Sequence, residues 1–281
     1  MIPTGPIFVG GTGRSGTTIV AQILDAHPRM HMIPIEVRFI VDPGGLCDLV
    51  AGRTDLESFE SQMVGPWWQR MRPDGDSRGL HKIIERDSLD EALDRLSRAS
   101  RDQLLESSRE FVHQILDPLA DAAGAETWVE MTPPNVAHGD ELLRLFPTMK
   151  LVHSVRNGKD VACSVTPLGW GPDDPISALT WWGDRMKDAQ LASAFLGSAN
   201  LLAIRLEDLI VHDREETLCR LLEFSGLEPD RAVDRFFRRE VTIGDSNIGR
   251  WAADIPADSR DDFLNRYDSI VTDLGRIGVD V

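Results

Sequence analysis

The chain has 281 residues, of which 42% are apolar and 27% are charged, a composition typical of a folded protein rather than a disordered one. Its formal net charge of −16 disfavours broad binding to nucleic acid or to an anionic membrane surface, because long-range repulsion opposes both. An anionic ligand therefore requires a local cationic pocket.

The three cysteines, Cys47, Cys163 and Cys219, lack the spacing of metal ligands, and their odd number does not suggest a disulfide framework. We therefore expect free thiols and no metal site. No run approaches the about 18 apolar residues of a membrane span, and the first residues lack the pattern of a secretory leader. With neither repeats nor linkers, the sequence predicts a single cytoplasmic domain over 1–281, without an integral membrane segment.

The first elements are predicted by apolar runs between glycines and prolines. Residues 6–10 predict a strand buried on both faces, and the apolar stripe after the next glycines predicts a helix that Pro28 ends near His27. Residues 87–123 predict one or two amphipathic helices. We expect the stretch of about 40–125 to be a helical insertion that forms a lid or binds an acceptor substrate.

Strands and helices alternate from residue 127 onward. The sequence predicts strands over 128–129, 150–155 and 201–204, and helices over 135–146, 158–165 and 174–196. A last helix is expected to begin near Ser259, with Asp262 at the spacing of a capping box, and to pack outside the sheet. The alternation implies an α/β fold whose parallel sheet binds ligands beyond the carboxyl ends of its strands.

The turn after the first strand predicts an anion cradle, because its backbone N–H groups and the next helix dipole face one side. Its members are Gly11, Thr12, Gly13, Arg14, Ser15, Gly16, Thr17 and Thr18. As a Walker A loop it lacks the lysine, since Thr17 stands there, so NTP hydrolysis is not expected. As a dinucleotide fingerprint it matches G-x-G-x-x-G, and Glu36 lies where a ribose-binding acid belongs. A third interpretation is a tight turn with no ligand.

Residues 8–18, followed by the sequence LDAHP at 24–28, resemble the 5′-phosphosulfate-binding loop of sulfotransferases, with the bacterial and tyrosylprotein branches nearest. Residues 150–164 resemble the 3′-phosphate site of the same family, in which Arg156 ends a strand and Ser164 lies on the next helix. The segments 128–133 and 205–209 also resemble family segments, although Met131 and Leu206 stand where lysine and tyrosine are frequent.

This resemblance implies an α/β, P-loop-like three-layer fold with a central parallel sheet flanked by helices and a helical insertion. It implies in-line sulfuryl transfer from 3′-phosphoadenosine 5′-phosphosulfate (PAPS) to a hydroxyl acceptor. The residues that it implies for binding PAPS are Gly13, Arg14, Ser15, Gly16, Thr17, Thr18, Arg156, Ser164 and Arg250. Arg14 is expected to stabilise the charge on the leaving oxygen, and no metal is expected to take part.

A hydroxyl acceptor also needs a general base. Glu36 is our first candidate, because a glutamate followed after one residue by arginine occurs at nearly this distance from the loop arginine in the tyrosylprotein branch. Glu130, at the end of its strand, is the alternative, and a buried structural carboxylate is the other interpretation of both.

The acceptor itself is not specified by the sequence. The acidic chain matches a polyanionic polysaccharide poorly, which favours a small molecule, a glycolipid or a peptide hydroxyl, unless local charge decides otherwise. Two further classes stay open: a nicotinamide dinucleotide-dependent oxidoreductase that uses Glu36 on the ribose, and a non-catalytic nucleotide-binding protein.

Overall fold

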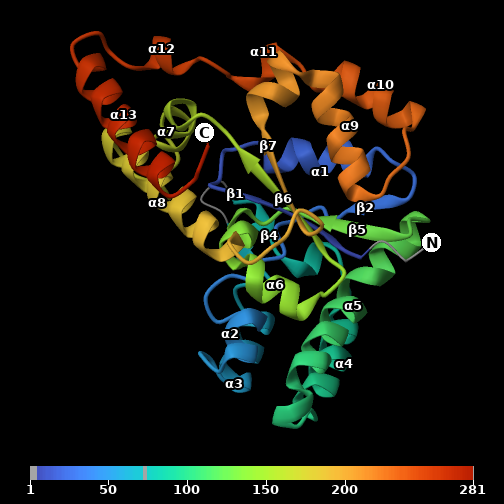
Figure 1. The fold of residues 1–281 in the computed structure, drawn as a ribbon. Helices are drawn as coiled ribbons and strands as arrows, with labels where there is room; N and C mark the ends of the chain where they lie inside the picture. Colours follow the sequence, from blue (N-terminus) through green and yellow to red (C-terminus); the bar gives the residue numbers. More distant parts are fainter. Residues whose placement is uncertain (1–4, 72–74, 281) are drawn as a thin grey trace.

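A parallel β-sheet forms the centre of the molecule (Figure 1). The computed structural model describes residues 5–71 and 75–280 of the chain. Five strands form this sheet in the order β2-β5-β1-β6-β7. They are β1 (Ile7–Gly11), β2 (Met30–Met32), β5 (Thr127–Glu130), β6 (Lys150–Val155) and β7 (Leu201–Arg205). The predicted α/β class is confirmed.

Strand β1 is buried along its whole length because it lies between two other strands and between two layers of helices. It pairs in parallel with β5 and β6, so that Ile7 lies opposite Val129 and Gly11 opposite Ser154. Its side chains alternate between two cores: Ile7 packs in one cluster and Phe8 in another. A continuous apolar run is the sequence pattern that such a strand requires.

One face of the sheet is covered by the helices in the upper part of Figure 1. They are α1 (Thr17–Asp25), α9 (Arg214–Ser225), α10 (Arg231–Glu240) and the π-helical turn Asp208–His212. Helix α1 begins directly after the glycine turn and ends two residues before His27, close to the predicted end.

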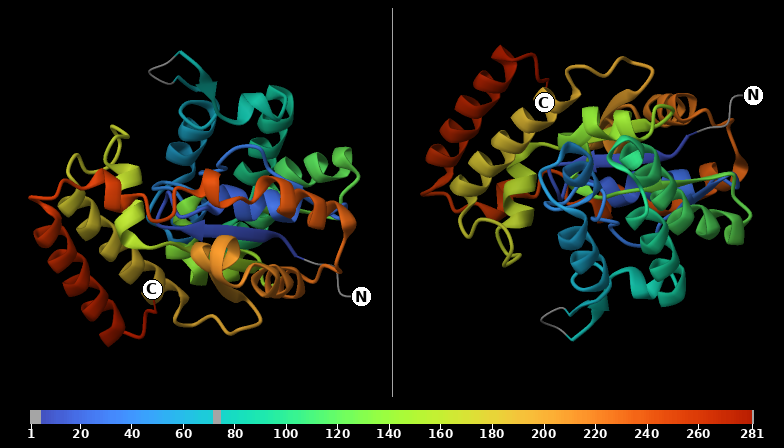
Figure 2. Two further views of the ribbon diagram at one scale, coloured as in Figure 1. Left: turned by 90° about the horizontal axis from the view of Figure 1, so that it is seen from above. Right: turned by 90° about the horizontal axis from the view of Figure 1, so that it is seen from below.

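The other face carries most of the stretch expected to be an insertion. Its helices are α2 (Leu46–Ala51), α3 (Leu56–Val64), α4 (Arg86–Ser97), α5 (Leu104–Ala123) and α6 (Gly139–Leu145), with short 3₁₀ turns at Leu80–Lys82, Arg101–Gln103 and Pro133–His138. A small antiparallel hairpin, β3 (Arg70–Met71) with β4 (Ser77–Arg78), extends from it. Figure 2 shows this group projecting to one side of the sheet.

A third group of helices lies at the β6 side of the sheet and is coloured yellow-green to red in Figure 2. It consists of α7 (Gly158–Val165), α8 (Pro175–Ser193), α12 (Trp251–Asp254) and α13 (Arg260–Arg276), and the short α11 (Ile243–Ser246) directly precedes α12. Helix α13 packs against α8 rather than on the sheet itself. The capping box expected at Ser259 is wrong, because its hydroxyl bonds Asp258 and caps no backbone N–H.

The later elements follow the predicted pattern closely. Strand β6 and helix α7 have the predicted bounds, and Asp174 caps α8 as expected, accepting from two backbone N–H groups. The helix predicted over 135–146 is instead a 3₁₀ turn followed by α6. In the part of the chain that the structure describes, no helix is both long and apolar enough to cross a membrane.

Candidate active site

The glycine turn between β1 and α1 has the backbone of an anion-binding loop. Gly13, Arg14 and Gly16 all have positive φ angles, of 83°, 58° and 91°. Left-handed residues in a turn direct backbone N–H groups toward one concave side, where the N-terminus of α1 adds its dipole. At Gly16 the φ of 91° favours glycine, and a Cβ there would also lie 2.6 Å from a methyl carbon of Leu206, which would have to move.

Some side chains of the turn are buried beneath it and others are exposed. Ser15, which the sequence placed on the phosphate, is fully buried, and its hydroxyl lies under the turn against Gly11. Ser154 of β6 donates to the Ser15 carbonyl at 2.6 Å. Thr17 is buried as well, whereas Arg14 and Thr18 are exposed. Ser154 thus holds the turn through the Ser15 backbone, while the buried Ser15 hydroxyl has no hydrogen-bond partner among the described residues.

The second anion-binding segment meets the first one in space. Arg156 follows β6 and donates from Nη1 to the Arg14 carbonyl at 3.0 Å. Ser164, on α7, accepts from Nε of Arg14 at 2.9 Å. The fold thus unites Arg14, Arg156 and Ser164, as the order and spacing of the two motifs predicted.

Arg156 is 6% exposed, and this burial lowers the pKa of its guanidinium. Its Nη2 donates to the carbonyls of Ser246 and Asn247, at 3.1 and 3.0 Å, while its Nε is buried without a partner in the described chain. A buried cation with an unused donor fits an anionic ligand, because an anion both satisfies the donor and offsets the cost of burying the charge.

Arg250 lies near this group without touching Arg156. It is exposed and bonds Asp254 and the side chain of Asn247, whose carbonyl accepts from Arg156. The surrounding loop is held by Asp160 of α7, which is 4% exposed and accepts from the N–H groups of Gly249 and Trp251, at 2.8 and 3.2 Å. The sequence analysis missed Asp160, although an acid in the first turn of the helix after Arg156 was a usable signal.

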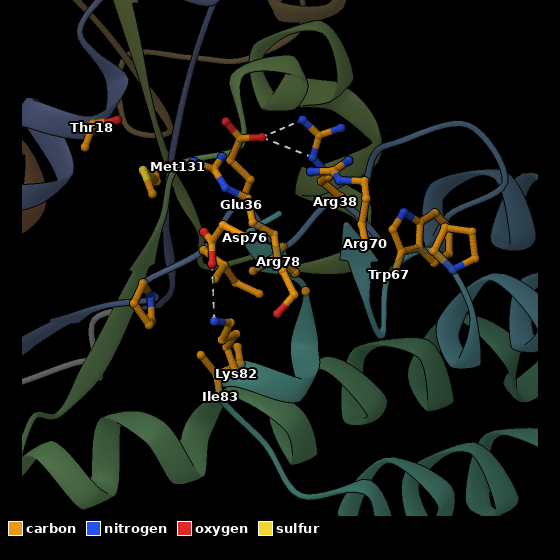
Figure 3. Close-up of a pocket in the computed structure, with 16 residues that line it drawn as sticks. Thr18, Glu36, Arg38, Trp67, Arg70, Asp76, Arg78, Lys82, Ile83 and Met131 are labelled. Carbon is orange, nitrogen blue, oxygen red and sulfur yellow. Dashed lines mark hydrogen bonds and ion pairs between the residues drawn. The ribbon is translucent and has the colours of Figure 1, made fainter. Parts of the chain in front are cut away.

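A cavity of about 500 Å³ opens beside the turn, and Thr18 belongs to its wall (Figure 3). Glu36 lines this cavity and pairs with Arg38, whose Nε and Nη2 both donate to Oε2 of Glu36, at 3.1 and 2.6 Å. Its other oxygen, Oε1, makes no hydrogen bond to a described residue. Three more cations line the same cavity, which are Arg70, Arg78 and Lys82.

Glu130, the alternative candidate base, does not line this cavity. It is 1% exposed, and burial raises its pKa. One oxygen accepts from the N–H groups of Val37 and Thr132, at 3.1 and 2.8 Å, and the other from Asn135 at 2.6 Å. Glu130 therefore positions the segment that follows Glu36 instead of meeting an acceptor.

Two tryptophans that the sequence did not indicate as site residues lie beside the glycine turn. The rings of Trp170 and Trp181 have centroids 6.2 Å apart, and an atom of each lies 3.7 Å from the position that a Cβ on Gly13 would take. Trp170 is 62% exposed. A large exposed aromatic ring next to an anion cradle offers a stacking surface for a planar group.

Taken together, the fold and this site define an α/β protein with a P-loop-like anion cradle, joined to a second cationic site and to an adjacent cavity. The model of the sulfotransferase family matches residues 6–231. The chain belongs to the sulfotransferase family, whose members transfer a sulfuryl group from PAPS, and the nicotinamide-dependent alternative is not supported.

Similar proteins agree with this assignment. Protein-tyrosine sulfotransferase A of Caenorhabditis elegans is 23% identical over 98% of this chain and 67% of its own length. Protein-tyrosine sulfotransferase 2 of Gallus gallus is also 23% identical, over 98% of this chain and 69% of its own. The sulfotransferase domain of the Synechococcus PCC 7002 olefin synthase shares the fold, with a TM-score of 0.55, 19% identity, and 95% and 94% of the two chains covered.

Proposed function

We propose that this sulfotransferase transfers the sulfuryl group to the hydroxyl of a peptide side chain that has acidic neighbours. The observation that carries the proposal is the position of the Glu36 cavity directly beside the glycine turn, with Thr18 in the wall they share. The donor phosphates belong to the turn and the Arg156 region, and the acceptor belongs to the cavity.

In this mechanism PAPS lies with its 5′-phosphosulfate on the N–H groups of 13–18 and its 3′-phosphate near Arg156 and Ser164. Arg14 exchanges its contact with Ser164 for the developing charge on the leaving phosphate oxygen. The acceptor oxygen forms a bond to sulfur while the bond from sulfur to the phosphate oxygen breaks. The acceptor proton passes to Oε1 of Glu36, since Oε2 is already held by Arg38.

The charge of the cavity supports the choice of acceptor. Although the chain is acidic as a whole, Arg38, Arg70, Arg78 and Lys82 give the cavity more cations than acids among the residues that line it. Local charge therefore overrules the argument from net charge, and carboxylates beside the reacting hydroxyl are favoured there. The names of the two protein-tyrosine sulfotransferases support tyrosine as the reacting residue.

The experiment that tests the base uses isotopically labelled donor and a peptide with tyrosine among aspartates. Glu36→Gln cannot take a proton, so turnover should fall roughly 100-fold to 10,000-fold while the product nucleotide still binds. Glu130→Gln serves as the comparison and should keep the larger share of turnover per folded molecule. An active Glu36→Gln enzyme beside an inactive, folded Glu130→Gln enzyme would transfer the base role.

The acceptor class is tested with the same donor and a second pair of variants. Arg78→Ala should raise KM for the acidic peptide about tenfold, the effect of one lost charge-assisted hydrogen bond, and leave KM for a simple phenol nearly unchanged. Arg95→Ala, on the exposed side of α4, is the matched control. Equal rates with acidic and neutral peptides would contradict an acidic acceptor, and transfer only to small alcohols or glycolipids would replace the peptide.

A cytoplasmic location also stays our proposal. It is supported by the three free cysteines, of which Cys47 is buried and Cys219 is exposed. Free thiols are characteristic of reducing compartments. Fractionation of the native host with an antibody to the chain tests this, and recovery from an oxidising compartment would refute it.

A further inference from the structure

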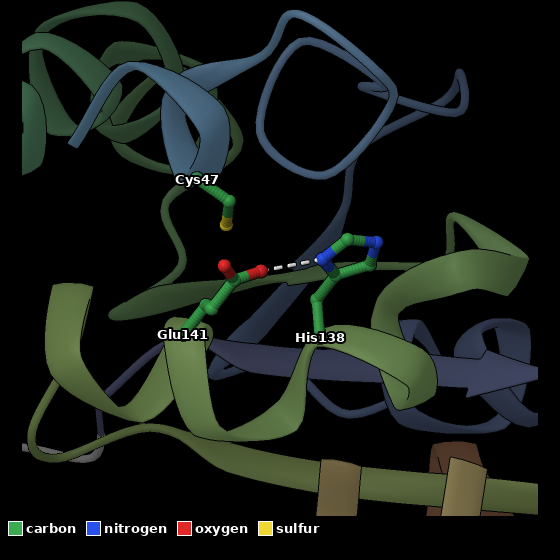
Figure 4. Close-up of side chains that lie close together, drawn as sticks. All are labelled: Cys47, His138 and Glu141. Atoms are coloured by element: carbon green, nitrogen blue, oxygen red, sulfur yellow. Dashed lines mark hydrogen bonds and ion pairs between the residues drawn. The ribbon is translucent and has the colours of Figure 1, made fainter. Parts of the chain in front are cut away.

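A second cluster of chemically reactive side chains lies away from the sulfuryl-transfer site, between α2 and α6 (Figure 4). Cys47 is buried on α2, His138 ends the 3₁₀ turn Pro133–His138, and Glu141 lies on α6. One ligand atom from each of the three residues lies within 4.8 Å of the other two. Figure 4 shows all three side chains pointing toward one another.

The chemistry of this trio is that of a transition-metal site. A thiol, an imidazole nitrogen and a carboxylate oxygen are the three ligand types that Zn²⁺ takes from proteins. Within the described chain the Cys47 thiol makes no hydrogen bond, and His138 Nδ1 lies 2.6 Å from Glu141 Oε2. Ligand atoms around tetrahedral zinc stand about 3.3 Å apart, so binding requires only a small opening of this pair.

The charges around the cluster also favour a cation. Asp48, Asp140 and Glu141 act electrostatically on the Cys47 thiol, against one opposing arginine, Arg53. Arg53 bonds Asp48 and the second oxygen of Glu141. Arg53 therefore holds Oε1 of Glu141 and leaves Oε2, beside His138, to bind the metal. Hydrogen bonds of this kind commonly orient metal ligands.

We propose that Cys47, His138 and Glu141 bind one divalent transition-metal ion, such as zinc, with a water molecule as fourth ligand. On binding, the Cys47 thiol loses its proton to solvent and the thiolate bonds the metal, while His138 gives the lone pair of Nδ1 and keeps its proton on Nε2. The metal lies outside the residues that transfer the sulfuryl group. It joins α2 to α6 and so braces the loop that carries Glu36, because Cys47 donates its backbone N–H to the carbonyl of Ile40.

The test uses metal-free full-length protein and Co²⁺ as a spectroscopic probe. We expect one equivalent of Co²⁺ to produce thiolate-to-cobalt charge-transfer absorption, which Zn²⁺ displaces and Mg²⁺ does not, since hard cations avoid thiolates. At roughly 100 times its Kd, Zn²⁺ should raise Tm by about 5 °C. Cys47→Ser should abolish the absorption, and Cys219→Ser, an exposed cysteine on α9, should keep it.

Substitution at the buried Cys47 risks unfolding, so His138→Gln provides the second variant, with His113→Gln as its control. His113 also hydrogen-bonds a carboxylate one turn away, that of Asp117. Loss of Zn²⁺ stabilisation in His138→Gln alone supports the site. Absence of thiolate absorption in the wild type, or its persistence in folded Cys47→Ser, overturns the proposal, and neither result depends on sulfuryl transfer.

Discussion

Arg14 combines an unusual backbone with a side chain that crosses to another element. Its φ of 58° is uncommon for a residue other than glycine, and strained conformations of this kind are enriched at functional sites. Because it is expected to stabilise charge on the leaving oxygen, Arg14→Ala should lower kcat at least about 100-fold, and Arg14→Lys should keep part of the rate. Initial rates at saturating donor measure this. An alanine variant with the wild-type rate would remove Arg14 from the mechanism.

Arg156 and Ser164 give a prediction about binding rather than rate. Ser164→Ala and Arg156→Ala should weaken binding of the product nucleotide, with Arg156 losing roughly 1.5 to 3 kcal/mol for a charged hydrogen bond. Calorimetric titration with the nucleotide, with and without its 3′-phosphate, measures the effect. If the wild type binds both forms equally, neither residue recognises that phosphate.

At the residue scale the sequence predicted the groups that carry charge and missed those that hold them. Arg14, Arg156 and Ser164 stand in recognisable spacing along the chain. Asp160 was missed because its partners, the N–H groups of 249 and 251, are distant in sequence. Glu130 stood as the alternative base because a carboxyl at a strand end has the same sequence pattern whether it faces solvent or, as here, accepts hydrogen bonds from backbone and side-chain donors.

Strand β6 contains a buried histidine that makes it sensitive to acid. Burial lowers the pKa of His153 to about 4, and its Nε2 has no partner among the described groups. Below about pH 6.5 His153 is therefore protonated in the unfolded chain but stays neutral in the folded one until about pH 4. Above pH 6.5 the histidine is neutral in both states and does not change the free energy of unfolding. Between about pH 6.5 and pH 4 only the unfolded chain is protonated at His153, so the free energy of unfolding should fall by about 1.4 kcal/mol per pH unit as the pH is lowered.

Denaturant unfolding at several pH values, for the wild type and His153→Gln, measures that contribution. Glutamine does not titrate here, so the stability difference between the two proteins should shift in favour of the variant as pH falls. Parallel pH dependences in both proteins would show that His153 takes up its proton in the folded protein at nearly the same pH as in the unfolded chain.

At the element scale, prediction succeeded where local signals are strong. Asp174 before Pro175 fixed the start of α8, and the apolar run at 150–155 fixed β6. The three-residue strand β2 and the β3–β4 hairpin carry no such signal, because their pairing depends on distant neighbours. The first part of the helix predicted over 135–146 is a 3₁₀ turn instead, in which Asn135 bonds Glu130 and the Val9 carbonyl, tertiary contacts that no local pattern encodes.

The charges of the molecule are unevenly distributed, because a chain with a net charge of −16 contains a cavity lined by four cations. If acidic acceptors bind there, kcat/KM for such a peptide should fall roughly threefold or more as salt rises to about 0.2 M, since screening weakens the attraction. The value for a neutral phenol should change little. Equal salt dependence of both acceptors would indicate that the cavity cations do not attract the acceptor.

The order of the strands in the sheet also determines when they can pair during synthesis on the ribosome. The central strand β1 emerges first, yet its partners β5 and β6 begin only at Thr127 and Lys150. This strand, which is buried along its whole length in the fold, therefore remains unpaired while the intervening helices are translated. Such a chain cannot pair both edges of β1 co-translationally until Val155 has been translated, and forms truncated before that point should be clients of chaperones.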